Sequence, residues 1–151
     1  MYIYQDTHRY FAQMPDDIKE IAGEEIARLG GGQVREAYRG VYFTADPKAL
    51  YRINYHARLI HRVLAPLVSF NCHSDRYLYR QALDVPWQDF LSPQESFAVL
   101  ATVSHSAMRH SRYAALRLKD AVVDACKART GKRPSDRKST RLNSSHVKIS
   151  Y

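Results

Sequence analysis

The stretch GVYFTADPKALYRINYHARLI, Gly40–Ile60, joins a β-rich run to a helix start. GVYFT (Gly40–Thr44) is apolar and aromatic, which favours a strand. Asp46-Pro47 is a strong helix start, because an Asp side chain caps free backbone N–H groups and Pro suits the first helical position. An apolar stripe then predicts a helix to about His61; its members are Leu50, Ile53, Ala57, Leu59 and Ile60.

The sequence before this stretch continues the alternation of strands and helices. Gln33–Tyr38 favours a second strand, which would pair with Gly40–Thr44 through a tight turn at Arg39-Gly40. Further upstream, acidic residues favour a helix start at Asp16-Asp17. Apolar positions at helical spacing continue to Leu29, where three glycines end the helix. These features predict a helix followed by a hairpin.

Two more β-rich segments lie at the ends of this pattern. His8–Met14 is short, aromatic and bounded by Pro15, and Arg62–Cys72 contains Pro66, which favours an edge strand or a bulge. The complete order is β-α-β-β-α-β. This order predicts a ferredoxin-like unit, in which an antiparallel sheet carries two helices on one face.

A second unit follows and is less complete. We expect a helix that Ser74-Asp75 caps and that ends at about Leu83, then a short turn at Pro86–Phe90. Ser96–Val103 favours a strand. A long helix, Arg112–Thr130, would be capped by Ser111 and closed by Gly131. One strand is not a sheet, so this unit looks unfinished, and the predicted fold class is α+β.

The composition argues against several classes of protein. No stretch approaches the roughly 20 apolar residues of a membrane helix, and the first twenty residues lack the apolar core of a signal peptide. Cys72 and Cys126 are far apart, which indicates a reducing cytoplasm rather than a disulfide framework. The seven histidines form no Cys/His cluster of metal-site spacing. We therefore expect a cytoplasmic protein with no membrane span and no metal.

The positive charge is large and local. The 151 residues carry a formal net charge of +8, with a pI near 9.6. Residues 1–103 hold 11 Lys/Arg against 12 Asp/Glu, whereas residues 104–135 hold eight against two and residues 136–151 hold four against one. A surplus confined to one region favours a polyanionic partner.

The last segment, DRKSTRLNSSHVKISY (Asp136–Tyr151), has no helical or strand period. Its Ser and Lys/Arg content is typical of a disordered basic tail. It also resembles the conceptual translation of a common sequencing-library adapter. We therefore expect residues 136–151 to be a non-native tail and leave them out of the fold prediction.

The long helix and its flanks carry the candidate RNA contacts. Side-chain cations would meet phosphates, and the first backbone amides of the helix would donate hydrogen bonds. Tyr113 is a candidate for stacking on a base. The candidate residues are Arg109, Ser111, Arg112, Tyr113, Lys119, Lys127, Arg129, Lys132 and Arg133.

A purely structural interpretation of this helix also exists. Cations near a helix C-terminus are favoured by the helix dipole, at about 0.3–1 kcal/mol each. Arg117 and Asp120 are spaced for a surface helix pair, and an aromatic residue near a helix start often serves packing. The one-sided charge favours RNA contact over this alternative.

The segment SHSAMRHSRYAALRLKDAVVDAC, Ser104–Cys126, resembles the signature of THUMP domains in bacterial large-subunit rRNA guanine-N2 methyltransferases. The matching positions are Arg109, Ser111, Tyr113, Lys119, Asp120 and Ala121. His110 and Arg112 depart from the signature, because Asn and Gln are usual there. The segments YFAQMPDDIKEIAGEEIARLGG, RGVYFTAD and RVLAPLVSFNCHSDRYLYRQALDVPW are similar to earlier parts of the same family, in the same order.

The resemblance implies a module that grips structured RNA, with 23S rRNA as the expected partner. It implies three regions: residues 1–48, the ferredoxin-like portion; residues 49–135, a THUMP domain truncated at its C-terminal end; and residues 136–151, the tail. The last helix and strand of the first portion, to about residue 73, overlap the THUMP region. In the family, a separate Rossmann-like domain binds S-adenosylmethionine and carries out methyl transfer. We expect a monomer.

The sequence has no strand–GxGxG–helix loop and no Asn/Asp-Pro-Pro-aromatic motif. We therefore expect no catalytic residue and no cofactor site within this chain. Three alternatives stay open. One is an RNA-binding module of another THUMP enzyme (a tRNA methyltransferase or a thiouridine synthase), and another is a ferredoxin-like module that binds a small ligand or a protein. The third is a truncated chain that has no function of its own and aggregates.

Overall fold

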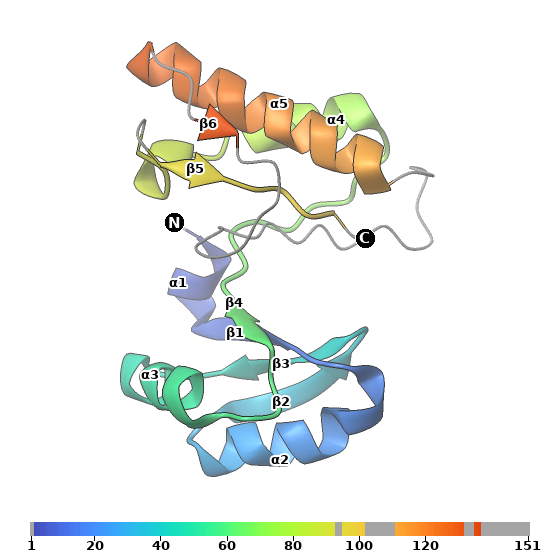
Figure 1. The fold of residues 1–151 in the computed structure, drawn as a ribbon, viewed down its shortest axis with the longest axis vertical. Coiled ribbons are helices and arrows are strands. Elements are labelled where there is room, and N and C mark those ends of the chain that lie inside the picture. Colours follow the sequence, from blue (N-terminus) through green and yellow to red (C-terminus); the bar gives the residue numbers. More distant parts are fainter. Residues whose placement is uncertain (1, 93–94, 102–110, 132–134, 137–151) are drawn as a thin grey trace. The chain divides into compact units, whose positions relative to one another are not determined.

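The structure is a computed structural model that describes residues 2–92, 95–101, 111–131 and 135–136 (Figure 1). The chain forms two compact units, Met1–Ser69 and Phe70–Tyr151. The helix Pro47–His56 and the strand Arg62–Leu64, which the sequence-based division places in its overlap of two regions, belong to the first unit.

The first unit is built on a four-stranded antiparallel sheet. Its strands are β1 (Arg9–Gln13), β2 (Gly32–Ala37), β3 (Gly40–Thr44) and β4 (Arg62–Leu64). Their spatial order is β2-β3-β1-β4, with β1 paired to both β3 and β4. Each helical connection therefore skips over one strand. This topology confirms the predicted ferredoxin-like unit.

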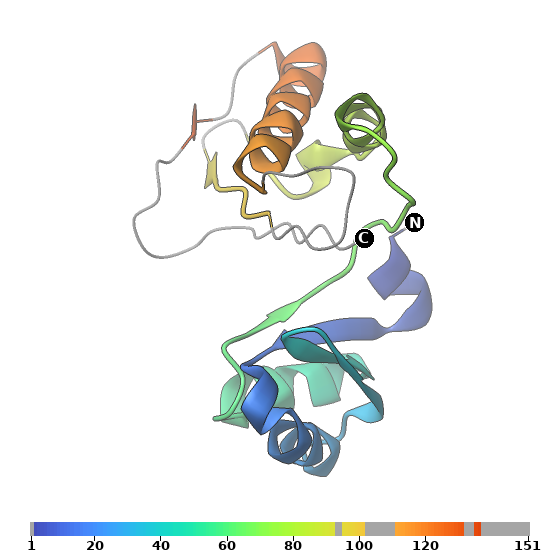
Figure 2. The ribbon, with the colours of Figure 1, turned by 90° about the vertical axis from the view of Figure 1, so that its right-hand side faces the viewer.

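Two helices cover one face of this sheet (Figure 2). They are α2 (Lys19–Arg28), which a 3-10 turn (η1, Asp16–Ile18) precedes, and α3 (Pro47–His56). Alternate side chains of β1 and β3 point toward the helices, because strand residues alternate between faces. The core comprises Tyr10, Ala12, Met14, Ala22, Ile26, Val41, Phe43, Ala45, Ala49 and Ile53.

Helix α3 begins where the sequence predicts and ends earlier. The Asp46 carboxylate accepts a hydrogen bond from the Ala49 amide at 2.7 Å, and Pro47 is the first helical residue. The helix ends at His56 rather than near His61. Beyond it the chain bends at Arg58 and Leu59, whose backbone N–H groups donate to the Glu25 carboxylate of α2 at 3.1 Å.

The segment after β4 also differs from the prediction. The strand expected over Arg62–Cys72 stops at Leu64, because the next backbone groups have other partners. A short helix that the sequence did not predict, α1 (Ile3–Thr7), donates its first two amides to the carbonyls of Leu67 and Pro66, at 3.1 Å each. Pro66 itself has no N–H to donate to a ladder.

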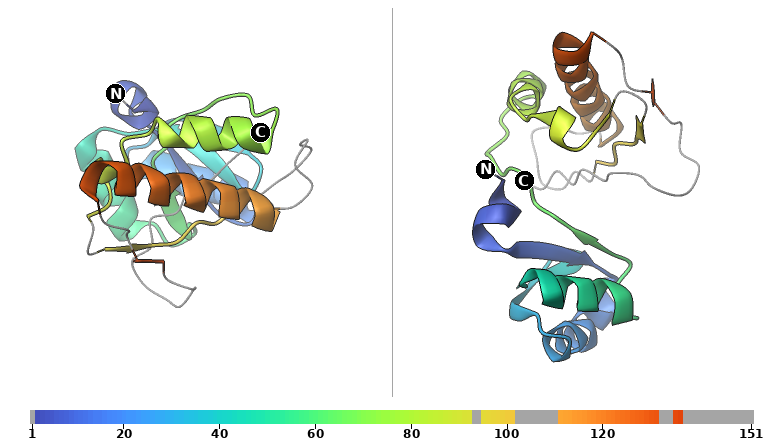
Figure 3. Two further views of the ribbon diagram at one scale, coloured as in Figure 1. Left: turned by 90° about the horizontal axis from the view of Figure 1, so that it is seen from above. Right: turned by 90° about the vertical axis from the view of Figure 1, so that its left-hand side faces the viewer.

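The second unit contains two helices side by side, α4 (Asp75–Leu83) and α5 (Ser111–Thr130) (Figure 3). Between them the chain forms a short 3-10 turn, η2 (Trp87–Asp89), in which the Trp87 indole donates to the Ala82 carbonyl at 2.7 Å. Buried apolar side chains join these elements; they include Leu78, Ala82, Trp87, Leu91, Ala114, Leu118, Ala121 and Val122.

The strand of the second unit is shorter than expected, and it has a partner. β5 covers Ser96–Phe97 rather than the predicted Ser96–Val103, of which residues 102–103 lie outside the described residues. It pairs in parallel with β6 (Ser135–Asp136). The expectation of a lone strand is therefore wrong: β5, α5 and β6 form a parallel crossover unit. β6 includes Asp136, the first residue of the predicted tail.

Candidate nucleic-acid interface

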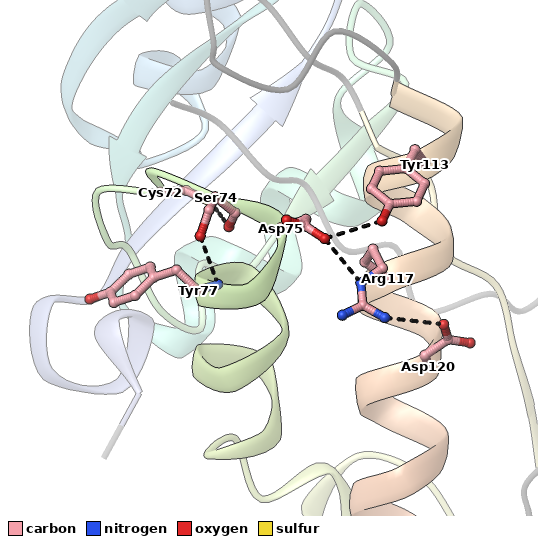
Figure 4. Close-up of polar contacts among 7 residues, drawn as sticks. All are labelled: Cys72, Ser74, Asp75, Tyr77, Tyr113, Arg117 and Asp120. Carbon is pink, nitrogen blue, oxygen red and sulfur yellow. Dashed lines mark hydrogen bonds and ion pairs between the residues drawn. The ribbon is translucent and has the colours of Figure 1, made fainter.

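The contact between α4 and α5 is centred on the Asp75 carboxylate (Figure 4). Asp75 lies in the first turn of α4, which Ser74 caps by accepting the Tyr77 amide at 3.2 Å. Asp75 Oδ2 accepts a hydrogen bond from the Tyr113 hydroxyl at 3.1 Å and lies 3.7 Å from Arg117 Nε. One carboxylate thus joins the start of α4 to two successive turns of α5.

Arg117 serves this helix contact. Its Nη1 lies 3.9 Å from Asp120 Oδ2, so the predicted surface pair is present. Its guanidinium carbon lies 4.9 Å from the centre of the Tyr79 ring, which adds a cation–π contact. Its buried Nε makes no hydrogen bond, because the nearest carboxylate, on Asp75, is an ion-pair partner beyond hydrogen-bond distance.

A second link between the helices is the Tyr79–Asp124 hydrogen bond. The Tyr79 hydroxyl donates to Asp124 Oδ2 at 2.6 Å. This bond to the carboxylate, followed by desolvation, raises the pKa of Tyr79 above its usual value. Both acids of α5 therefore interact with neighbouring side chains near α4.

Three cations of α5 gather on one flank of the helix. At about 100° per residue, Arg112, Lys119 and Lys127 fall within about a quarter-turn of one another. Arg112 and Lys119 lie at least about 80° from Asp120 and Asp124, whereas Lys127 lies within about 60° of both acids. We call these three residues the α5 flank. Arg112 and Lys127 are exposed, and Lys119 is half-buried. Arg117 and Tyr79 engage Asp120 and Asp124, so the three cations leave the α5 flank positive.

The remaining predicted contacts have mixed outcomes. Tyr113 keeps 49% of its surface exposed although its hydroxyl is bonded to Asp75. α5 begins at Ser111, so Ser111 is its first residue rather than a cap before it. Arg129 is exposed in the last turn. Arg109, Lys132 and Arg133 lie outside the described residues. Contact of any of these residues with RNA stays a prediction.

Sequence reasoning missed Asp75 and Tyr79 as partners of the basic helix. Asp75 and Tyr113 are 38 positions apart, and Tyr79 and Asp124 are 45 apart. The only sequence signal was the Ser74-Asp75 helix start, which predicts the helix but not its neighbour. Identifying the partners required knowledge of which helices pack together.

Other kinds of site are not found in the described part of the chain. No group of three or more His, Cys, Asp or Glu side chains is placed to hold a metal ion there. None of the helices in that part is long and apolar enough to cross a membrane. Cys72 and Cys126 form no disulfide with each other, and burial raises the pKa of the Cys126 thiol.

Family comparisons match both units. Residues 9–64 match the family model described as the RlmL ferredoxin-like domain, and residues 73–149 match the THUMP domain model. The second match overlaps most of the segment 136–151 that the sequence analysis assigns to a tail.

Among curated relatives, a ribosomal RNA large subunit methyltransferase K/L of Cellvibrio japonicus is 37% identical over 128 residues, which is 85% of this chain and 17% of the relative. Two solved structures share the fold. One, described as "a predicted N6-adenine-specific DNA methylase" of Listeria monocytogenes, has a TM-score of 0.72 at 24% identity and covers 93% of this chain and 36% of that one. The other, SMU.472 complexed with SAH, has a TM-score of 0.69 at 18% identity, covering 94% and 37%.

The chain spans only about a fifth to a third of the length of the curated relatives it matches first. Within that span, the order of elements, the strand order and both domain models agree. The chain belongs to the THUMP-domain family, with an RlmL-type ferredoxin-like domain ahead of its THUMP domain.

Proposed function

We propose that this chain is the RNA-binding module of an S-adenosylmethionine-dependent 23S rRNA guanine-N2 methyltransferase. It positions structured RNA for a catalytic domain that lies outside these 151 residues. The relative from Cellvibrio japonicus, a large-subunit rRNA methyltransferase, supports the class of substrate. The observation that carries the proposal is the group of cations on the α5 flank, whose neighbouring acids are engaged by other side chains.

RNA binding follows from this arrangement. Asp75, Asp120 and Asp124 are engaged by Tyr113, Arg117 and Tyr79, so their negative charge is held near α4. The α5 flank then meets RNA phosphates, and each phosphate neutralised by Lys or Arg releases condensed counterions. S-adenosylmethionine, bound by the other domain, supplies the methyl group. The residues of this chain grip and orient the RNA.

The test uses charge reversal on the full chain. Arg112→Glu with Lys127→Glu is expected to weaken binding to a structured 23S rRNA fragment by at least about tenfold at moderate salt. The control is Arg76→Glu with Arg80→Glu, which makes the same change in net charge at two exposed positions of α4. Fluorescence anisotropy measures both affinities. An equal loss in the two variants would refute the α5 flank as the binding surface.

Neutral variants distinguish direct phosphate contacts from the effect of the overall net charge. Arg112→Gln with Lys127→Gln should lower the slope of log affinity against log salt by about 1.8, since each lost phosphate contact contributes roughly 0.9. Tighter binding to tRNA than to the 23S fragment would favour another THUMP enzyme as the parent. An absence of binding to either RNA would favour a ferredoxin-like module that recognises a ligand or a protein.

A further inference from the structure

The outer face of α3, in the ferredoxin-like unit, carries two unusually exposed aromatic side chains. Tyr55 keeps 86% of its surface exposed and Tyr51 keeps 79%, the largest values among the large apolar side chains of the described residues. The same helix buries Ala49 and Ile53 on its inner face. These rings therefore contribute little to the core, and their role has to be sought outside the unit.

Basic side chains share this face. Lys48, Tyr51, Arg52 and Tyr55 stand at the i, i+3, i+4, i+7 spacing of one helical stripe, and His56 follows. Lys48, Arg52 and His56 are exposed, and the His56 ring meets the Tyr55 ring edge-on at 4.9 Å. We call these five residues the α3 ridge.

The nearby acids do not neutralise the α3 ridge. Residues 47–56, all of which the structure describes, contain no Asp or Glu. Asp46 is engaged in capping the helix through Ala49, and Glu25 binds the amides of Arg58 and Leu59 beyond its end. The ridge thus combines two open aromatic rings with a one-sided positive charge.

We propose that the α3 ridge binds unpaired nucleotides of RNA, with bases stacked on Tyr51 and Tyr55 and phosphates at Lys48 and Arg52. This inference rests on the proposed function and adds a second RNA contact, in the other unit. Aromatic rings flanked by cations form a stacking platform that accepts any base. Protein interfaces are also rich in Tyr and Arg but depleted in Lys, so the charge pattern favours a nucleic acid.

The spacing of the rings predicts the kind of RNA. Tyr51 and Tyr55 are about one helical turn apart, and one turn rises 5.4 Å. Neighbouring bases in a B-DNA strand are only about 3.4 Å apart. Two neighbouring bases that stack on the two rings must therefore separate from each other. The ridge should select single strands over duplexes.

The test compares a fluorescein-labelled uridine oligonucleotide of about eight residues with a blunt RNA duplex of the same length. In the full chain, Tyr51→Ala with Tyr55→Ala should weaken binding of the single strand about thirtyfold, with less than about a twofold change for the duplex. Tyr51→Phe with Tyr55→Phe should keep the affinity, because both rings remain. The matched control is Tyr38→Ala, at a tyrosine that is 60% exposed in the same unit.

A second readout reports stacking directly. Tyr55→Trp adds a second tryptophan to the buried Trp87. The fluorescence of this added tryptophan should be quenched when the oligonucleotide binds. Unchanged affinity of the double Ala variant for the single strand would overturn the α3 ridge as an RNA site. If the Arg112→Glu, Lys127→Glu chain still lost its affinity for the 23S fragment, the proposed function would stand without the ridge. Failure of the unaltered chain to bind any RNA would overturn both.

Discussion

Gly40 and Gly131 both disfavour a larger residue, but for different physical reasons. At Gly40 a Cβ would collide with the Ala12 carbonyl oxygen and the Phe11 ring, so there is no space for a side chain. At Gly131, which ends α5, nothing lies within 4 Å of such a Cβ, but φ is 68°. There the limit is the left-handed conformation that residues with a Cβ rarely adopt.

Replacement of Gly40 should therefore damage the sheet. Gly40→Ala is expected to lower the free energy of unfolding by about 1–3 kcal/mol, because the paired strand β1 cannot move away without breaking its ladder. Gly131→Asn should change it by less than about 1 kcal/mol, since Asn tolerates the left-handed region. Urea denaturation followed by circular dichroism measures both. Equal effects would contradict the close approach at Gly40.

At the scale of elements, the Tyr79–Asp124 hydrogen bond makes the α4–α5 pair sensitive to alkaline pH. Because the folded pKa of Tyr79 is raised, its stabilising effect is complete below its ordinary pKa of 10.0 and is lost as pH rises through the folded value. Between about pH 9 and about pH 11, the unaltered chain should lose stability more steeply than Tyr79→Phe. Urea unfolding at several pH values measures this slope.

Tyr10 shares part of this alkaline response, because burial raises its pKa as well. The Tyr79→Phe curve should therefore be flatter without becoming level. Asp124→Asn should also flatten the curve, since it removes the negative charge that opposes ionisation of Tyr79. Parallel curves for all three proteins would show that the hydrogen bond does not contribute.

The sequence predicted the order of elements better than their ends. The Asp46-Pro47 start of α3 is a local signal, so it could be identified and is confirmed. The end of α3 depends on Glu25, whose carboxylate binds amides 33 and 34 positions later in the chain. No local pattern contains that contact. For the same reason, apolar periodicity extended the helix past His56.

In the candidate site too, features set by local sequence were predictable and contacts between distant segments were not. One-sided charge marked α5, and helical spacing placed three of its cations, Arg112, Lys119 and Lys127, on one flank. The partners of Tyr113 and Arg117 could not be predicted, because Asp75 reaches them only through packing of two helices distant in sequence. β6 was likewise missed, since two residues are too few to give a strand pattern.

At the scale of the whole molecule, the two units differ in how firmly their sheets are held. β1 is paired on both sides within four strands, whereas β5 and β6 form a ladder of two residues each. Local opening is cheapest where few backbone hydrogen bonds must break. Amides of β1 and β3 should therefore exchange with deuterium at least roughly a hundredfold more slowly than those of β5 and β6. Similar rates in both sheets, measured by mass spectrometry or NMR, would contradict this difference.

The parallel β5–β6 pair has a consequence for synthesis on the ribosome. Every strand of the first sheet has been translated by residue 64, so that unit can close while the nascent chain is still growing. β5 can pair only after about 40 further residues have been translated and Ser135 and Asp136 have left the exit tunnel. A ribosome that stalls between residues 98 and 134 would thus release a chain with one finished unit and one open strand edge, a template for aggregation that quality-control proteases would have to remove.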